Sequence, residues 1–136
     1  MITKLAIFEG TLKPGAEAEM RAYVEDTLAP LWRNFTGANR VRVLFAEKQD
    51  AAAVEESRSI PLILEVDYLT QADLDQAMAS PARYKSRDLL PGFYERFFED
   101  VRLKHFEFSY QKFPTKSSNE ERQKCESTTK KWNASD

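Results

Sequence analysis

The residues that could do acid–base chemistry in this chain fall in three segments that read as strands. His105 and Glu107 are separated by one residue, and Glu65 and Arg42 lie in earlier segments of the same type. Side chains two positions apart in a strand point to the same side. A histidine beside a carboxylate can take up and return a proton near neutral pH. We therefore predict His105 as a general base, with Glu107 or Glu65 as its orienting partner and Arg42 as an anchor for an anion.

Side chains alternate between the two faces of a strand, which divides the residues of the sheet into two sets. We expect the more apolar set to face the helices. The helix-facing set is then Ala6, Phe8, Val41, Val43, Phe45, Leu62, Leu64, Val66, Tyr68, Phe106, Phe108 and Tyr110. The opposite set is Ile7, Glu9, Arg42, Leu44, Ile63, Glu65, Asp67, His105 and Glu107. A set of this kind is more often a solvated face or the rim of an interface than a catalytic cavity. Both interpretations stay open.

Composition excludes several other chemistries. The net charge of −2 and the pI of about 5.6 argue against a nucleic-acid surface and an anionic-membrane surface. No apolar run is long enough to span a bilayer. With one histidine and one cysteine, Cys125, neither a multi-histidine nor a thiolate metal site can form. We predict no metal, no cofactor and a cytoplasmic location, since an unpaired thiol suits a reducing compartment.

The elements that must position these residues follow from periodicity. We predict strands at Lys4–Thr11, Arg40–Glu47, Pro61–Tyr68 and Val101–Phe113. A helix should run from about Ala16 toward Gly37. A second helix should start after Thr70, its predicted N-cap, with interruptions at Ser80-Pro81 and Pro91-Gly92.

The order β-α-β-β-α-β predicts a ferredoxin-like α+β fold, with a four-stranded antiparallel sheet and two helices on one face. We place this domain at residues 1–113. Residues 114–136 form a polar segment with too little apolar surface to fold, so we predict a flexible tail. The uncovered face of the sheet needs a partner, and a second copy would close a dimeric α/β barrel.

The segment Tyr23–Trp32 resembles the first-helix motif of the EthD-like proteins, which belong to the dimeric α/β-barrel superfamily. That motif reads roughly aromatic, then Asn/Asp-Thr-His-x-Pro-Leu. The matching residues here are Tyr23, Asp26, Thr27, Pro30 and Leu31. Leu28 stands where the motif has its histidine, so this chain lacks the motif's acid–base residue.

The stretch Ser80-Pro81-Ala82-Arg83-Tyr84 is similar to the Ser-Pro or His-Pro break of this superfamily. Arg83 stands where cyclase-like members carry a functional second histidine, so their chemistry does not carry over. The superfamily includes cofactor-free monooxygenases, lactone isomerases, polyketide cyclases and small auxiliary proteins. The resemblance covers residues 1–113 and implies the fold more strongly than any activity.

These observations leave three hypotheses. The first is an EthD-like protein, auxiliary to a catabolic or biosynthetic pathway, that binds a small apolar or aromatic molecule. The residues predicted to bind that molecule are Trp32, Tyr84, Tyr23, Leu28 and Arg83. The second is a cofactor-free isomerase, polyketide-type cyclase or monooxygenase that uses His105. The third is a structural or regulatory dimer whose charged sheet face is only an interface.

Overall fold

The fold is one antiparallel sheet with helices on one side. The computed structural model describes residues 1–47 and 59–115. Its strands are β1 (Ile2–Leu12), β2 (Arg40–Phe45), β3 (Leu62–Tyr68) and β4 (Phe98–Ser109). Its helices are α1 (Glu17–Tyr23), the π-helix η1 (Val24–Leu28), α2 (Ala29–Trp32), α4 (Gln71–Met78) and α5 (Pro81–Phe97). The predicted connection at residues 48–58 and the tail from residue 116 onward lie outside the described residues.

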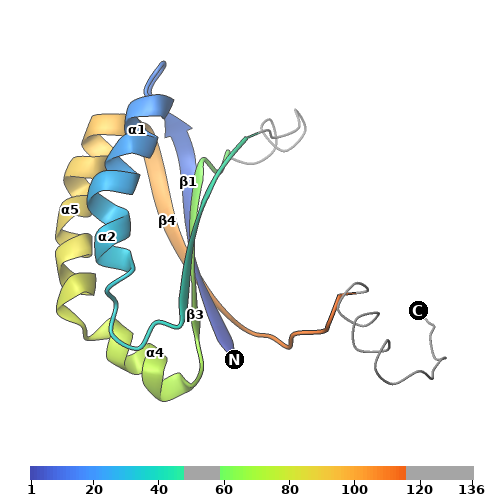
Figure 1. The fold of residues 1–136 in the computed structure, drawn as a ribbon. Helices are drawn as coiled ribbons and strands as arrows, with labels where there is room; N and C mark the ends of the chain where they lie inside the picture. Colours follow the sequence, from blue (N-terminus) through green and yellow to red (C-terminus); the bar gives the residue numbers. More distant parts are fainter. Residues whose placement is uncertain (48–58, 116–136) are drawn as a thin grey trace.

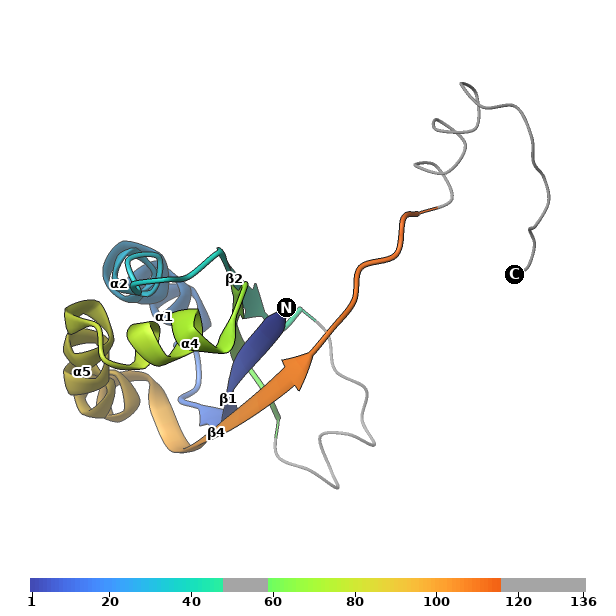
Figure 2. The ribbon, with the colours of Figure 1, turned by 90° about the horizontal axis from the view of Figure 1, so that it is seen from below.

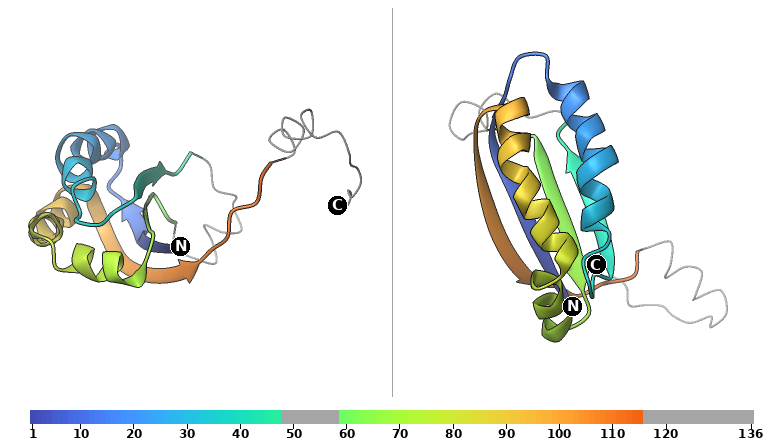
Figure 3. Two further views of the ribbon diagram at one scale, coloured as in Figure 1. Left: turned by 60° about the horizontal axis from the view of Figure 1, so that its bottom comes forward. Right: turned by 90° about the vertical axis from the view of Figure 1, so that its left-hand side faces the viewer.

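The four strands are ordered β2-β3-β1-β4, and every neighbouring pair is antiparallel. The described helices all lie on the same face of this sheet, and the other face carries no described helix (Figures 1 and 2). The long helical run from α1 to α2 and the helix α5 lie side by side on the sheet and run roughly along its strands (Figure 3). The predicted α+β ferredoxin-like fold is therefore confirmed.

The first helical run is continuous but changes its winding midway. Ala29 N–H bonds to the Val24 carbonyl, five residues back, which is the π-type bond. Pro30 follows at once and has no N–H to donate to the residue four positions earlier. A wider turn just before a proline accommodates its ring, so the EthD-like motif segment forms a single helix with a π-turn.

The second helical region begins as predicted and then departs from the prediction. Thr70 Oγ1 accepts a hydrogen bond from Asp73 N–H at 3.1 Å, which confirms the predicted N-cap of α4. Ser80 caps α5 in the same way, with Pro81 in its first turn. The predicted break at Pro91-Gly92 is wrong, because α5 runs through Pro91 to Phe97. Packing of Phe93 and Phe97 on the sheet holds the helix together past the proline.

The core lies between the sheet and the helices. Phe8, Leu62 and Tyr68 enter it from the strands, and Trp32 and Phe93 enter it from the helices. Several predicted strand bounds differ from the observed ones by two to four residues, some too short and some too long. The most marked case is β4, which starts at Phe98 and ends at Ser109 instead of running from 101 to 113.

One face assignment from the sequence is wrong. His105 is the register partner of the buried Ala6, and Leu103 is the partner of the buried Phe8. On β4, therefore, His105 lies on the helix side of the sheet. Phe106 and Phe108 lie on the opposite side, where they are 43% and 52% exposed. Glu107 lies on the same side as His105, so its predicted face is wrong too. Tyr110 was predicted on the helix side, but its hydroxyl donates a hydrogen bond to Asp67 on the open face.

Candidate functional site

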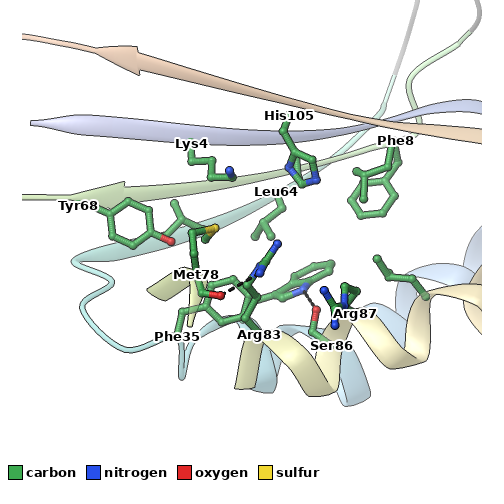
Figure 4. Close-up of a pocket in the computed structure, with 15 residues that line it drawn as sticks. Lys4, Phe8, Phe35, Leu64, Tyr68, Met78, Arg83, Ser86, Arg87 and His105 are labelled. Atoms are coloured by element: carbon green, nitrogen blue, oxygen red, sulfur yellow. Dashed lines mark hydrogen bonds between the residues drawn. The ribbon is translucent and has the colours of Figure 1, made fainter. Parts of the chain in front are cut away.

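A cavity of about 180 Å³ lies between the sheet and the helices α2, α4 and α5 (Figure 4). The strands β1, β3 and β4 form its roof, and α5 forms much of its floor. Its lining residues are Lys4, Ala6, Phe8, Trp32, Phe35, Leu64, Val66, Tyr68, Met78, Arg83, Ser86, Arg87, Leu90, Leu103 and His105. Most of them are apolar or aromatic, and the polar groups are few. Small-molecule sites in proteins have this composition.

One wall of the cavity is held rigid by a buried hydrogen bond. The indole Nε1–H of Trp32 donates to Ser86 Oγ at 3.0 Å, which ties α2 to α5. Both side chains are buried. Trp32 also packs against Phe8 with ring centroids 6.3 Å apart. The wall therefore presents a fixed aromatic surface to anything that enters the cavity.

His105 reaches the cavity from β4 (Figure 4). Partial desolvation lowers the pKa of His105 below its usual value, and the charges of Lys4 and Arg83 lower it further. Glu107 acts in the opposite direction with a smaller effect. At neutral pH the imidazole is therefore neutral, and it can either donate or accept a hydrogen bond.

Two cationic side chains enter the cavity from opposite sides. Lys4 comes from β1, and its Nζ lies 3.4 Å from Glu107 Oε2. Arg83 comes from the first turn of α5, and its Nη1 donates to the Met78 carbonyl at 2.8 Å. A third cation, Arg87, lines the cavity one helical turn further along α5 and lies over the ring of Tyr84 at 5.1 Å.

Tyr68 ends β3 at the edge of the cavity and is almost fully buried, with 1% exposure. Its hydroxyl has no hydrogen-bond partner among the described residues. Burial raises the pKa of Tyr68 to about 12, so the hydroxyl stays protonated at neutral pH. Burying an unpaired hydroxyl is costly, and native proteins rarely leave one without a partner.

The structure divides the four residues predicted as a catalytic group. His105 lines the cavity, and Glu107 lies near it on the same side of the sheet. Glu65 and Arg42 lie on the opposite face, where Arg42 Nη2 and Glu65 Oε1 form an ion pair at 2.9 Å. Since the sheet separates them from His105, neither residue can orient its ring or anchor its ligand within this chain.

The five predicted ligand-binding residues also divide. Trp32 and Arg83 line the cavity. Tyr23 instead stacks on Phe93 with centroids 5.6 Å apart, and Leu28 is sealed in the core. Tyr84 points outward and is 42% exposed. The motif positions taken from the first helix are therefore mostly packing positions here.

Sequence reasoning missed four of the polar residues that line the cavity, namely Lys4, Tyr68, Ser86 and Arg87. Lys4 has the same strand parity as Ala6 and Phe8, and that parity could have placed it beside them. Tyr68 was assigned to the correct face but counted only as core. Nothing in the sequence marks its hydroxyl as unpaired, because that property depends on which polar atoms the tertiary fold brings near.

The described residues contain neither a helix suited to crossing a membrane nor a cluster suited to a metal ion. No described helix is long and apolar enough to cross a membrane. No group of three or more His, Cys, Asp or Glu side chains within residues 1–47 and 59–115 could hold a metal ion.

Solved structures supply the comparison that decides the fold. An EthD family protein from Bacillus halodurans superposes with a TM-score of 0.58 at 20% identity, over 82% of this chain and 99% of that one. This chain has the fold of an EthD family protein. No protein-family model matches the sequence, and no curated protein matches it either.

Two other solved structures have the same fold. A variant of SnoaB, a cofactor-independent oxygenase from Streptomyces nogalater, has a TM-score of 0.53 at 16% identity, covering 82% of this chain and 94% of that one. HapK from Hahella chejuensis has a TM-score of 0.54 at 14% identity, covering 85% and 97%. At these identities the EthD-like fold is shared, while activity is not carried from one chain to another.

Proposed function

We propose that this EthD-like chain binds a small molecule with an aromatic or otherwise apolar body in the cavity between its helices and its sheet. One observation carries the proposal: an apolar cavity contains a few polar groups, and one of them, the buried Tyr68 hydroxyl, lacks a partner among the described residues. A bound polar group would satisfy it. The volume of about 180 Å³ suits a ligand built on one or two rings, since a cavity of roughly 150 Å³ holds benzene.

Ligand-observed NMR with single-ring and two-ring aromatic compounds tests this function. The wild-type protein should give saturation transfer to some of them. Ala6→Leu fills the cavity from the sheet and should abolish the transfer, because Ala6 is a buried lining residue. Ala22→Leu makes the same change on the exposed side of α1 and should leave binding intact. Equal binding by both variants would place the ligand elsewhere.

A second candidate function is catalysis without a cofactor, and the position of His105 favours it. The imidazole lines the cavity and is neutral at neutral pH, as a general base must be. No hydrogen bond joins it to a carboxylate among the described residues, so the orienting partner predicted for it is not in place. The proposal therefore assigns proton abstraction to His105 alone.

Deuterium exchange tests this candidate with 2-indanone, a ring-sized ketone with acidic C–H bonds. His105→Gln should slow exchange on the order of 100-fold, which is the lower range for general-base catalysis. Binding of the ketone should be unchanged. If wild-type and His105→Gln proteins exchange at the same rate, the chain binds its ligand without catalysing proton transfer.

We also propose that the chain forms a homodimer through the sheet face that the helices leave open. Phe106 and Phe108 stack there with centroids 6.3 Å apart, and both are exposed. The same face carries cations and anions together, including the pairs Arg42–Glu65 and Lys104–Glu9. Such a face can complement a second copy of itself across a two-fold axis. A cytoplasmic location remains part of the proposal, on the single cysteine.

A further inference from the structure

We propose that the ligand of this cavity is an anion, with a carboxylate or phenolate oxygen attached to its apolar body; this inference rests on the proposed function. The polar groups that reach the cavity are nearly all donors or cations. A neutral hydrocarbon would leave the Tyr68 hydroxyl without a partner, and a cationic ligand would be repelled by the Lys and Arg side chains. The class of ligand follows from where those groups lie.

The first observation concerns charge. Among the described residues that line the cavity, three are Lys or Arg and none is Asp or Glu. The chain as a whole has a net charge of −2, so this local excess of positive charge is not a general property of its surface. Glu107 pairs with Lys4, but its side chain is 48% exposed and it does not line the cavity.

Arg83 supplies the fork that an oxyanion fits. One of its terminal nitrogens bonds to the Met78 carbonyl, and this bond fixes the direction of the guanidinium. Figure 4 shows the group pointing from α5 into the cavity, toward the sheet. No acidic side chain within the described ranges forms an ion pair with it. A guanidinium presents several donors in one plane, a geometry that matches carboxylate oxygens.

Tyr68 supplies a neutral donor to the same cavity. Its hydroxyl is buried, unpaired within the described part of the chain and protonated at neutral pH. Arg83 is close enough to lower the pKa of Tyr68 against the larger effect of burial. The same Arg83 charge acts on His105, and all three side chains line the cavity. An oxyanion bound between Arg83 and Tyr68 would receive a charged and a neutral donor together.

The probe that reads this preference directly is 4-nitrophenol, which ionises near neutral pH and is yellow only as the phenolate. Bound in a cavity of this charge, it should ionise at a lower pH than it does in water, with a shift of about one unit or more. Benzoate and benzamide provide a second test, because they have nearly the same shape and differ in charge. Benzoate should bind about tenfold or more tightly than benzamide, the ratio expected for one charge-assisted hydrogen bond.

Variants at three cavity residues, with one control outside the cavity, show which side chains produce the preference. Tyr68→Phe should weaken binding of the phenolate about tenfold while leaving 4-nitroanisole, its neutral methyl ether, unaffected. Lys4→Met should reduce the preference for the anion, and Lys85→Met, an exposed change on α5 outside the cavity, should not. Arg83→Met should abolish the preference. Arg83→Lys should restore part of it, which separates charge from any damage to folding.

The outcomes keep the two proposals apart. Preference for 4-nitrophenolate and benzoate, lost in Arg83→Met, supports both. If the neutral ether and benzamide bind as well as the anions, the cavity is a ligand site but the inference of an anionic ligand is overturned. If neither anions nor neutral compounds bind, the proposed function fails, and the inference fails with it. Anion binding that persists unchanged in both Arg83→Met and Lys4→Met would place the anion outside the cavity and overturn the inference.

Discussion

At the residue scale, the site depends on a few polar atoms set in an apolar wall. The Trp32–Ser86 hydrogen bond joins two helices next to the cavity, so it contributes both to stability and to the shape of the site. Tyr68, in contrast, lowers the stability of the free protein, because its buried hydroxyl has no partner among the described residues. That hydroxyl would gain a partner when an oxygen-bearing ligand binds.

Trp32→Phe should destabilise the free protein by about 2 kcal/mol. The change removes the buried hydrogen bond to Ser86 and leaves a void where the larger ring packed. Urea unfolding followed by circular dichroism measures it. Tyr84→Phe is the aromatic control, because that side chain is exposed and should change stability by less than about 0.5 kcal/mol. Equal effects in the two variants would mean that the Trp32 contact adds nothing.

His105 offers a direct electrostatic test, because it is the only histidine in the chain. Its proton NMR titration should have a midpoint below 6.5, the ordinary value, because of desolvation and the neighbouring Lys4 and Arg83. Lys4→Met should raise the midpoint, and Glu107→Gln should lower it. A wild-type midpoint at or above 6.5 would contradict the position assigned to the ring.

The lowered pKa of His105 also predicts how the stability of the fold changes with pH. The unfolded chain binds the His105 proton more readily than the folded chain, so folding is disfavoured as the pH falls below about 6.5 toward the folded-state pKa. His105→Gln should remove that part of the pH dependence. The check is the difference in urea midpoint between wild type and variant, measured at pH 7.5 and at about pH 5. A difference that does not change with pH would rule out this contribution.

Part of the site could be predicted from sequence, and the remainder needed the fold. Trp32 and Arg83 were selected as ligand residues and do line the cavity. Glu65 and Arg42 were joined to His105 because apolar content was used to choose a face. On β4 that criterion fails, since Val101 and Leu103 lie on one face while Phe106 and Phe108 lie on the other. Hydrophobicity alone cannot orient a strand whose two faces are both partly covered.

At the scale of elements, prolines shape both helical regions without breaking them. Pro30 follows the π-turn of η1, and Pro91 lies within the continuous α5. Local rules predicted an interruption at Pro91 because proline lacks the N–H that the helix needs. Tertiary packing outweighs that loss, since the turn after Pro91 places Phe93 and Phe97 in the core.

Pro91→Ala should therefore stabilise the protein, by about 1 to 2 kcal/mol, because it restores a helical N–H. Gly92→Ala is a companion change. A Cβ at position 92 meets nothing within 4 Å, so the gain expected from lower backbone entropy is about 0.5 to 1 kcal/mol. Thermal and urea unfolding measure both. Destabilisation by Pro91→Ala would show that the packing of α5 requires a bend at the proline.

At the scale of the whole molecule, the order of strands and helices determined the fold prediction, and that order was legible in the sequence. Apolar periodicity marked each strand, and the turn residues separated them, so the ferredoxin-like topology followed. The helices cover one face of the sheet (Figure 3). The cavity forms between these two layers. The other face is left for the proposed second copy.

Sedimentation velocity tests that second copy. The wild-type protein should sediment with the mass of two chains, and Phe106→Asp should shift it to one chain by placing a charge in the apolar part of the open face. Phe113→Asp is the matched control, since Phe113 is 78% exposed and follows the end of β4. A single-chain mass for the wild-type protein would contradict the proposed homodimer.

The measurement that most directly tests the central proposal is a crystal structure of the protein soaked with 4-bromobenzoate, in which anomalous scattering locates the bromine. The account predicts a bromine peak inside the cavity near Trp32 and Leu64, with the carboxylate directed toward Arg83. Bromine found only on the outer surface or on the open face of the sheet, with the cavity empty, would contradict it.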